Sequence, residues 1–371
     1  MPGAYQYLPL ERVIFGKPAA QAAAEEAARI GAKRVFVVSS KTLSRSTDEI
    51  SRIGKSLGST YAGLFDECIA HTPWPSVLAA AAAVREAKPD LILTVGGGTP
   101  IDTVKILQIL LAHEVADLAG MESLRIATKP SPVRQVVIPT TLSGAEFSNI
   151  GGGTDPRTKL KHSFSGPDVG ARSVILDPAI TMHTPEWLWR STGVRGVDHA
   201  VEALLSIEAN AYCDGLALHA LRLFAKHLSK TGIEDRLACQ QASWLAASTI
   251  GRVPYGASHG IGHALGAAAN VPHGHTSCVM LPHVMRYNEP VAKEKQKDIA
   301  GALGQPGVTA AEAVAQLIAD LGQPSTLCAV GVKREQLGFI ADAALKNRWV
   351  QTNPRPFSRD EMVSLLENAY D

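Results

Sequence analysis

Two stretches in the second half of the chain bring histidines together with charged side chains at helical spacing. The segment "STGVRGVDHAVEALLS" contains Arg195, His199 and Glu202 within two turns of an expected helix. The later segment "SHGIGHALGAAANVPHGH" contains His259, His263, His273 and His275. Neutral imidazoles bind divalent metal ions and also transfer protons near neutral pH. The two stretches therefore indicate either a metal site or a metal-free acid–base site.

A glycine turn in the first half has the properties of a phosphate site. In "LILTVGGGTPIDTVK", residues 96–98 are glycines at the end of an apolar run, and a helix is expected to open at about Pro100. Glycines let the backbone approach a pyrophosphate, and a helix N-terminus supplies N–H groups and a positive dipole end. The spacing matches no generic nucleotide motif, so a tight turn without a ligand is the alternative.

A second polar turn, "IPTTLSGAEFSN", follows another buried strand. Its hydroxyl side chains stand beside Gly144 and are Thr140, Thr141 and Ser143. Two polar turns at the carboxyl ends of parallel strands favour a dinucleotide lying across the edge of the sheet.

The elements that position these residues differ between the two halves. The first half alternates Ala-rich helical stretches with strands that are apolar on both faces, which predicts a doubly wound parallel sheet. After about Pro178 the strand signals stop, and from Pro185 onward successive amphipathic helices are expected. We therefore predict an α/β domain over 1–180 and an all-α domain over 181–371. The expected strands are 34–39, 91–95, 134–141 and 173–178, and the expected helices include 197–209, 214–230, 235–251, 309–322 and 358–371.

Bulk properties exclude several classes of function. A formal net charge of +1 argues against a nucleic-acid partner, and no apolar run is long enough for a membrane span. The N-terminal residues lack the order of a signal peptide, and the five cysteines are scattered, as in a reduced cytoplasmic protein. We expect a cytoplasmic enzyme with a small-molecule substrate, and the Ala-rich helical half favours a homodimer.

Several motifs in series resemble those of the iron-containing alcohol dehydrogenase family, which shares its architecture with dehydroquinate synthase. They are "ERVIFG", "GGGTPIDTVK", "IPTTLSGAE", "ILDPAIT", "HAVEALLS", "HGIGHALG" and "PHGHTSCVMLPHVMRYN". The resemblance covers nearly the whole chain. It implies an N-terminal nucleotide-binding domain, a helical domain, a cleft between them, and hydride transfer between NAD(P) and an alcohol or carbonyl compound.

The resemblance also implies which residues face the cofactor. Ser40 stands where many members carry an Asp that holds the adenosine ribose. A serine does not repel a 2′-phosphate, and Lys41 and Arg45 lie close in sequence, so we expect NADH or NADPH to be accepted. The alternative is a solvated serine without influence on specificity. The other cofactor-side positions are Gly97, Gly98, Asp102, Thr140, Thr141, Ser143 and Lys161.

At the histidine cluster this chain departs from the family pattern. Metal-bearing relatives hold one ion with an Asp, a His four residues later and two further His, and the matching residues here are Arg195, His199, His259 and His273. His263 matches a further histidine near the nicotinamide. Three imidazoles and a water could still bind Zn²⁺ or Fe²⁺.

Replacing an anionic ligand by arginine disfavours a metal ion. At about 5 Å and an effective dielectric near 20, a guanidinium and a divalent ion repel each other by several kcal/mol. Asp198 is expected to be a poor substitute, because neighbours on a helix point about 100° apart. We therefore expect no metal at His199, His259 and His273, unless Arg195 turns outward.

The leading hypothesis is an NAD(P)H-dependent, metal-independent reductase of a small oxo-carboxylic acid. Arg195 would bind a substrate carboxylate or the developing enolate, and His263 or His259 would relay the proton. The maleylacetate reductase branch resembles this chain in lacking the carboxylate ligand, although its characteristic members carry Asn there. Maleylacetate reduced to 3-oxoadipate is thus the favoured reaction. A metal-dependent alcohol dehydrogenase or aldehyde reductase is the main alternative, and a lyase or a nucleotide-binding regulator with the same fold is a third.

Overall fold

The computed structural model describes residues 4–124, 126–158 and 160–371. It divides into two units between Thr184 and Pro185, four residues after the boundary expected from the sequence. Two hydrophobic clusters lie within the first unit, and another lies within the second.

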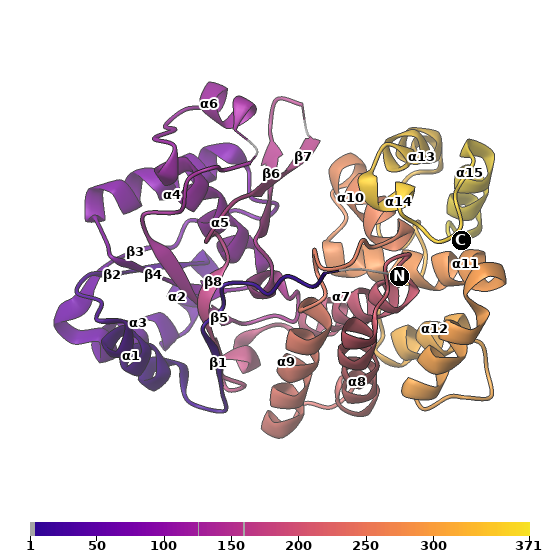
Figure 1. The fold of residues 1–371 in the computed structure, drawn as a ribbon, viewed down its shortest axis with the longest axis horizontal. Helices are drawn as coiled ribbons and strands as arrows, with labels where there is room; N and C mark the ends of the chain where they lie inside the picture. The colour runs from indigo at the N-terminus through magenta and orange to yellow at the C-terminus, as the bar shows by residue number, and fades with distance from the viewer. Residues whose placement is uncertain (1–3, 125, 159) are drawn as a thin grey trace. The chain divides into compact units, whose positions relative to one another are not determined.

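The first unit is built on a six-stranded sheet with the order β1-β8-β5-β4-β2-β3, in which every neighbouring pair is parallel. The doubly wound parallel sheet predicted from the sequence is confirmed (Figure 1). Its strands are β1 (Arg12–Phe15), β2 (Val35–Ser39), β3 (Tyr61–Phe65), β4 (Leu91–Gly96), β5 (Arg134–Pro139) and β8 (Ala171–Leu176).

Helices cover both faces of this sheet because the alternate residues of each buried strand point to opposite sides. One apolar cluster joins α1 (Ala19–Ile30) and α3 (Glu49–Leu57) to the strands, and another joins α4 (Trp74–Ala87) and α5 (Gly98–Ala112) to them. The first unit also contains α2 (Lys41–Ser46), α6 (Leu118–Ser123) and an antiparallel hairpin of β6 (Ile150–Asp155) and β7 (Leu160–Ser165).

The regular elements of the second unit are helices. Its α-helices are α7 (Glu186–Leu205), α8 (Ala211–His227), α9 (Ile233–Ala247), α10 (Ala257–Ala269), α11 (His273–Ala302), α12 (Ala310–Asp320), α13 (Leu337–Leu345), α14 (Arg348–Gln351) and α15 (Arg359–Asn368). The predicted all-α second half is therefore confirmed, and in the described part of the chain no helix is both long and apolar enough to cross a membrane.

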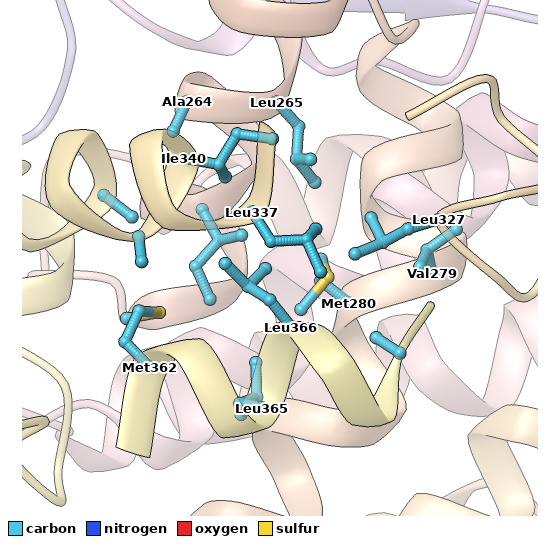
Figure 2. Packing of buried hydrophobic residues seen from close by; sticks show 14 of the residues in the cluster. Ala264, Leu265, Val279, Met280, Leu327, Leu337, Ile340, Met362, Leu365 and Leu366 are labelled. Atoms are coloured by element: carbon cyan, nitrogen blue, oxygen red, sulfur yellow. The ribbon is translucent and has the colours of Figure 1, made fainter. Parts of the chain in front are cut away.

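Figure 2 shows the core that holds the histidine-bearing helices in place. Leu265 of α10 and Met280 of α11 pack with Leu337 of α13 and Leu366 of α15, and all four side chains are buried. Each buried side chain of this size contributes roughly 1.5–3 kcal/mol relative to an exposed one, so α10 and α11 form a rigid support.

Candidate active site

At the carboxyl edge of the parallel sheet, the two polar turns expected from the sequence lie side by side. Gly97 is the N-cap of α5, and a Cβ added to it would come within 2.9 Å of Thr141 Cγ2. A Cβ on Gly98 would come within 3.4 Å of Ser143 Oγ, and Thr140 N donates to the carbonyl of Gly96 over 3.0 Å. The close fit of bare glycine backbone against these hydroxyl residues forms a cradle that suits a pyrophosphate at a helix N-terminus.

Asp102 and Lys161, two further residues on the expected cofactor side, meet at the hairpin. Asp102 accepts a hydrogen bond from Gly152 N over 3.1 Å and another from the buried Lys105 Nζ over 3.4 Å. A Cβ on Gly152 would meet Lys161 Cε and lie 3.6 Å from Asp102 Oδ2. Asp102 therefore ties α5 to the β6–β7 hairpin, a structural contact that no local sequence pattern reveals.

Ser40 serves first as a helix cap. It is the N-cap of α2, and its side chain accepts a hydrogen bond from Leu43 N over 3.4 Å. Lys41 and Arg45 lie near it as expected, but each contacts a carboxylate after β3: Lys41 Nζ is 3.3 Å from Glu67 Oε1, and Arg45 Nε is 3.3 Å from Asp66 Oδ2. These contacts could not be predicted from sequence spacing, because each carboxylate is more than 20 residues from its cation in the chain.

In the second unit, α7 supplies the charged residues of the histidine cluster. Arg195, Asp198, His199 and Glu202 are all buried. Arg195 is only 8% exposed, and its Nη1 lies 3.1 Å from Ser277 Oγ on α11 and 3.5 Å from Asp198 Oδ2. The guanidinium therefore points into the protein and not into solvent, which is the arrangement on which the metal-free interpretation depends.

Asp198, expected to be a poor substitute for the anionic ligand, lies inside the histidine cluster. Its Oδ2 accepts hydrogen bonds from Ser277 Oγ over 2.6 Å and from Ser258 Oγ over 2.9 Å, in addition to the contact with Arg195. The angle of about 100° between neighbouring side chains applies within one helix. Side chains of α10 and α11 approach Asp198 from other directions. The spacing of three residues between Arg195 and Asp198 predicts their contact on one helix, whereas no sequence pattern predicts the contacts with the two serines.

His259 lies at the centre of the cluster, between Glu202 and His199. Its Nδ1 is 2.7 Å from Glu202 Oε2, and its Nε2 is 2.8 Å from His199 Nδ1. The ring of Tyr255 packs against both imidazoles, with centroid separations of 4.5 Å and 5.6 Å. Burial and Arg195 lower the pKa of His259, but Asp198 and Glu202 outweigh them, so the net shift is upward.

Glu202 anchors the start of α10. Its carboxylate accepts hydrogen bonds from Gly256 N, Ser258 N and His259 N at 2.8–3.3 Å, so it satisfies N–H groups that the first turn of a helix leaves unpaired. The negative charge is also favourable at this end of the helix dipole. Glu202 thereby fixes the position of the His259 backbone as well as its ring.

The other two expected histidines, His263 and His273, lie beside each other. The ring centroids of His263 and His273 are 6.0 Å apart, and His263 Nδ1 lies 3.3 Å from Asn347 Nδ2. His199 thus contacts His259, and His273 lies beside His263.

A buried group of side chains in the second unit could hold a divalent ion. In the described part of the chain, the group whose ligand atoms lie within 4.8 Å of one another is Asp198, Glu202 and His259, which differs from the predicted trio His199, His259 and His273. Glu202 already accepts backbone N–H bonds, and Asp198 accepts from serines and contacts the guanidinium. Asp198 Oδ1 is buried without a hydrogen-bond partner among the described residues, but a metal ion bound here would lie near the positive charge of Arg195.

Comparison with known proteins agrees with this architecture. Residues 10–178 match the family model described as iron-containing alcohol dehydrogenase, and residues 190–370 match the C-terminal model of the same family. The chain belongs to the iron-containing alcohol dehydrogenase family. It is accordingly an NAD(P)-dependent oxidoreductase.

Relatives within this family carry several different names. The chain is 33% identical to dehydrogenase ALT3 of Alternaria alternata, over 91% of this chain and 99% of that protein. It is 30% identical to maleylacetate reductase of Delftia acidovorans, over 97% and 95% of the two chains. The structure superposes on maleylacetate reductase from Agrobacterium tumefaciens with a TM-score of 0.85 at 27% identity, covering 100% and 98% of the chains. It superposes on a 1,3-propanediol oxidoreductase with a TM-score of 0.91 at 29% identity, covering 99% and 100%. The comparisons therefore establish the family but not the substrate.

Proposed function

We propose that this family member is a metal-independent, NAD(P)H-dependent reductase of a small oxo-carboxylic acid, with maleylacetate reduced to 3-oxoadipate as the reaction. The observation that carries the proposal is the buried guanidinium of Arg195, in the place where metal-bearing relatives have an anionic ligand. The glycine and hydroxyl cradle at the sheet edge fits NAD(P)H, which supplies the hydride when bound.

Arg195 has the chemistry needed to recognise an oxo acid. An arginine carries a planar fork of N–H donors, and a carboxylate or an enolate oxygen accepts such bonds with charge assistance. Asp198 and Ser277 hold the guanidinium in one position, so little conformational entropy is lost when the substrate binds. Arg195 can thus supply the positive charge that a metal ion supplies in relatives.

The histidines can supply the proton that the substrate takes up after hydride transfer. Hydride adds to the alkene carbon of maleylacetate that is β to the ketone, and the resulting enolate takes one proton on the carbon α to the ketone. His259 is held by Glu202 and hydrogen-bonded to His199, so a proton on His259 can pass through His199. His263 is the other candidate donor.

One observation favours a second function, that of a metal-dependent alcohol dehydrogenase or aldehyde reductase. Asp198, Glu202 and His259 offer two carboxylates and an imidazole close together, and the fold matches a 1,3-propanediol oxidoreductase. In that case the hydrogen bonds that occupy these carboxylates must rearrange when the ion binds.

The two functions are separated by assaying chelator-treated enzyme. We expect NADH oxidation with maleylacetate to persist when elemental analysis finds far less than one metal per chain. Activity that returns only on addition of Fe²⁺ or Zn²⁺ overturns the metal-independent proposal and supports the second function.

Replacement of Arg195 tests its role directly. R195Q is expected to lower kcat/KM for maleylacetate by about 10²-fold or more, because a hydrogen bond to a charged group contributes about 1.5–3 kcal/mol and a bidentate contact makes two. R190Q on the same helix is the matched control, since Arg190 pairs with Glu186 and donates to the carbonyl of Leu321. Equal losses in the two variants would contradict a specific role for Arg195.

A further inference from the structure

The carboxyl ends of three neighbouring strands are joined by specific contacts at the adenosine side of the sheet edge. Ser39 Oγ at the end of β2 donates to the carbonyl of Val95 over 2.9 Å, immediately before the glycine turn. Ser40 forms an antiparallel bridge with Glu67, which follows β3. A dinucleotide whose pyrophosphate lies at the glycine turn therefore reaches Ser40, Asp66 and Glu67 in the direction of β3.

The carboxylates of Asp66 and Glu67 lie at this end of the sheet edge. Asp66 accepts hydrogen bonds from Ser44 Oγ over 2.6 Å and Arg45 Nε over 3.3 Å, and its side chain is 18% exposed. The bond from Ser44 and the charge of Arg45 hold the pKa of Asp66 below its usual value, against the effect of burial. Glu67 lies 3.3 Å from Lys41 Nζ and 3.5 Å from Arg45 Nη2. The two cations that could attract a phosphate are thus already paired.

We propose that the enzyme binds NADH in preference to NADPH, and that Asp66 and Glu67 are the residues that determine this specificity. In other dinucleotide-binding folds an acidic residue at the end of β2 binds the adenosine ribose. In this enzyme the acidic residues after β3 have that role. Ser40 does not discriminate, because its side chain caps α2.

Charge explains the direction of the preference. The 2′-phosphate of NADPH carries close to two negative charges at neutral pH, whereas the ribose hydroxyls of NADH are neutral donors that carboxylates accept. Lys41 and Arg45 together balance Asp66 and Glu67, so the local charge is near zero and not +2. NADPH must either displace the carboxylates from their partners or lie beside them.

The test measures coenzyme binding without any substrate, by the change in nicotinamide fluorescence on titration with NADH and with NADPH. The inference rests on the NAD(P) dependence of the family and not on the proposed oxo acid, so its failure is distinguishable from failure of the proposed substrate. We expect the wild-type enzyme to bind NADH about tenfold more tightly than NADPH. In D66N/E67Q, the ratio of the two dissociation constants should shift toward NADPH by about tenfold, and the shift should weaken at high salt.

Two further variants keep this test interpretable. E67Q changes a 60% exposed side chain and should fold even if the double variant does not, with a smaller shift in the same direction. D48N is the matched control: Asp48 lies on the surface at the start of α3, 3.9 Å from Arg52, and its replacement should leave the ratio unchanged. The proposal is overturned if the wild-type enzyme prefers NADPH, if D66N/E67Q and E67Q leave the ratio unchanged, or if D48N shifts it equally.

Discussion

Arg195 and Asp198 act as a unit, and their charges have to be considered together. In this cluster the buried Arg195 is contacted by an aspartate three residues later in the sequence. Burial raises the pKa of Asp198, but His259 and Arg195 lower it more strongly, and the net shift is downward. A buried guanidinium and a buried carboxylate thus compensate each other, which explains why a cation is tolerated so deep in the second unit.

Removal of this carboxylate should destabilise the protein substantially. D198N keeps the shape of the side chain but leaves Arg195 without its nearest anion, and breaking a buried ion pair costs about 3–5 kcal/mol. We expect a loss near the lower end of that range in urea unfolding, because an amide oxygen still accepts from Ser258 and Ser277. D342N is the control, since Asp342 pairs with Arg359 at the surface and its loss should cost less than about 1 kcal/mol. Equal losses would show that the Arg195–Asp198 contact does not matter for stability.

The sequence predicted which residues belong to the cluster better than it predicted their contacts. Helical spacing placed Arg195, His199 and Glu202 on one helix, and the structure has them on α7. It could not place Ser277 beside Asp198, because that contact depends on how α11 docks on α7. Family spacing grouped His273 with His199 and His259, and the structure places the His273 ring 6.0 Å from that of His263.

At the scale of elements, the glycines of α10 show why this helix carries residues that disfavour helices. The sequence left open whether a cofactor or a facing helix approaches them. A Cβ on Gly260 would lie 2.5 Å from Val350 Cγ2 and 3.0 Å from Val350 N, and one on Gly262 would lie 2.8 Å from Thr276 Oγ1. The neighbours are thus α14 and α11, and the glycines allow these helices to approach α10 closely.

This packing predicts opposite effects for the same substitution at two helical glycines. G260A should destabilise the protein by about 1–3 kcal/mol, since overpacking outweighs the gain in helix propensity. G215A should stabilise it by about 0.5–1 kcal/mol, because Gly215 lies on the exposed face of α8 with no heavy atom within 4 Å of an added Cβ. Thermal or urea unfolding measures both, and a stabilised G260A would mean that α14 does not pack against α10 as described.

Strands with continuous apolar residues could be predicted from the sequence, whereas partly exposed strands at the sheet edges could not. The strands at 91–95 and 134–141 correspond to β4 and β5, whose residues are almost all buried. β1 and β3 were missed because they lie at the edges of the sheet and are partly exposed, and β6 was missed because it begins with glycines after Ile150. Pro282 and Pro290 lie inside α11, although its backbone becomes non-helical only at Ala292.

At the scale of the whole molecule, each unit has its own buried core and its own buried charges. In the first unit, Lys105 is fully buried and donates to the carbonyls of Ala145 and Ile150, while Glu146 is 2% exposed. Burial raises the pKa of Glu146 to about 7, against the lowering effects of a backbone hydrogen bond and Lys105. The carboxyl group therefore keeps its proton in the folded state at pH values where the unfolded chain has released it.

This difference makes the free energy of unfolding depend on pH in a definite direction. Between the ordinary pKa of 4.5 and the folded value of about 7, the folded state binds more protons than the unfolded state, so stability falls as pH rises through this window. The full loss above the folded pKa is roughly 3 kcal/mol, at 1.36 kcal/mol for each pKa unit. E146Q removes the titrating group, so its stability relative to the wild type should increase by about that amount between pH 5 and pH 8.

Thermal or urea unfolding of both proteins at the two pH values measures this difference, and taking the difference cancels every other titrating group. E86Q, the same substitution at an exposed position on α4, controls for the change of side chain. If the second unit unfolds in a separate transition, only the transition of the first unit should carry the effect, because Glu146 belongs to that core. An E146Q variant whose relative stability is the same at pH 5 and pH 8 would mean that Glu146 is already ionised in the folded protein and compensated by Lys105.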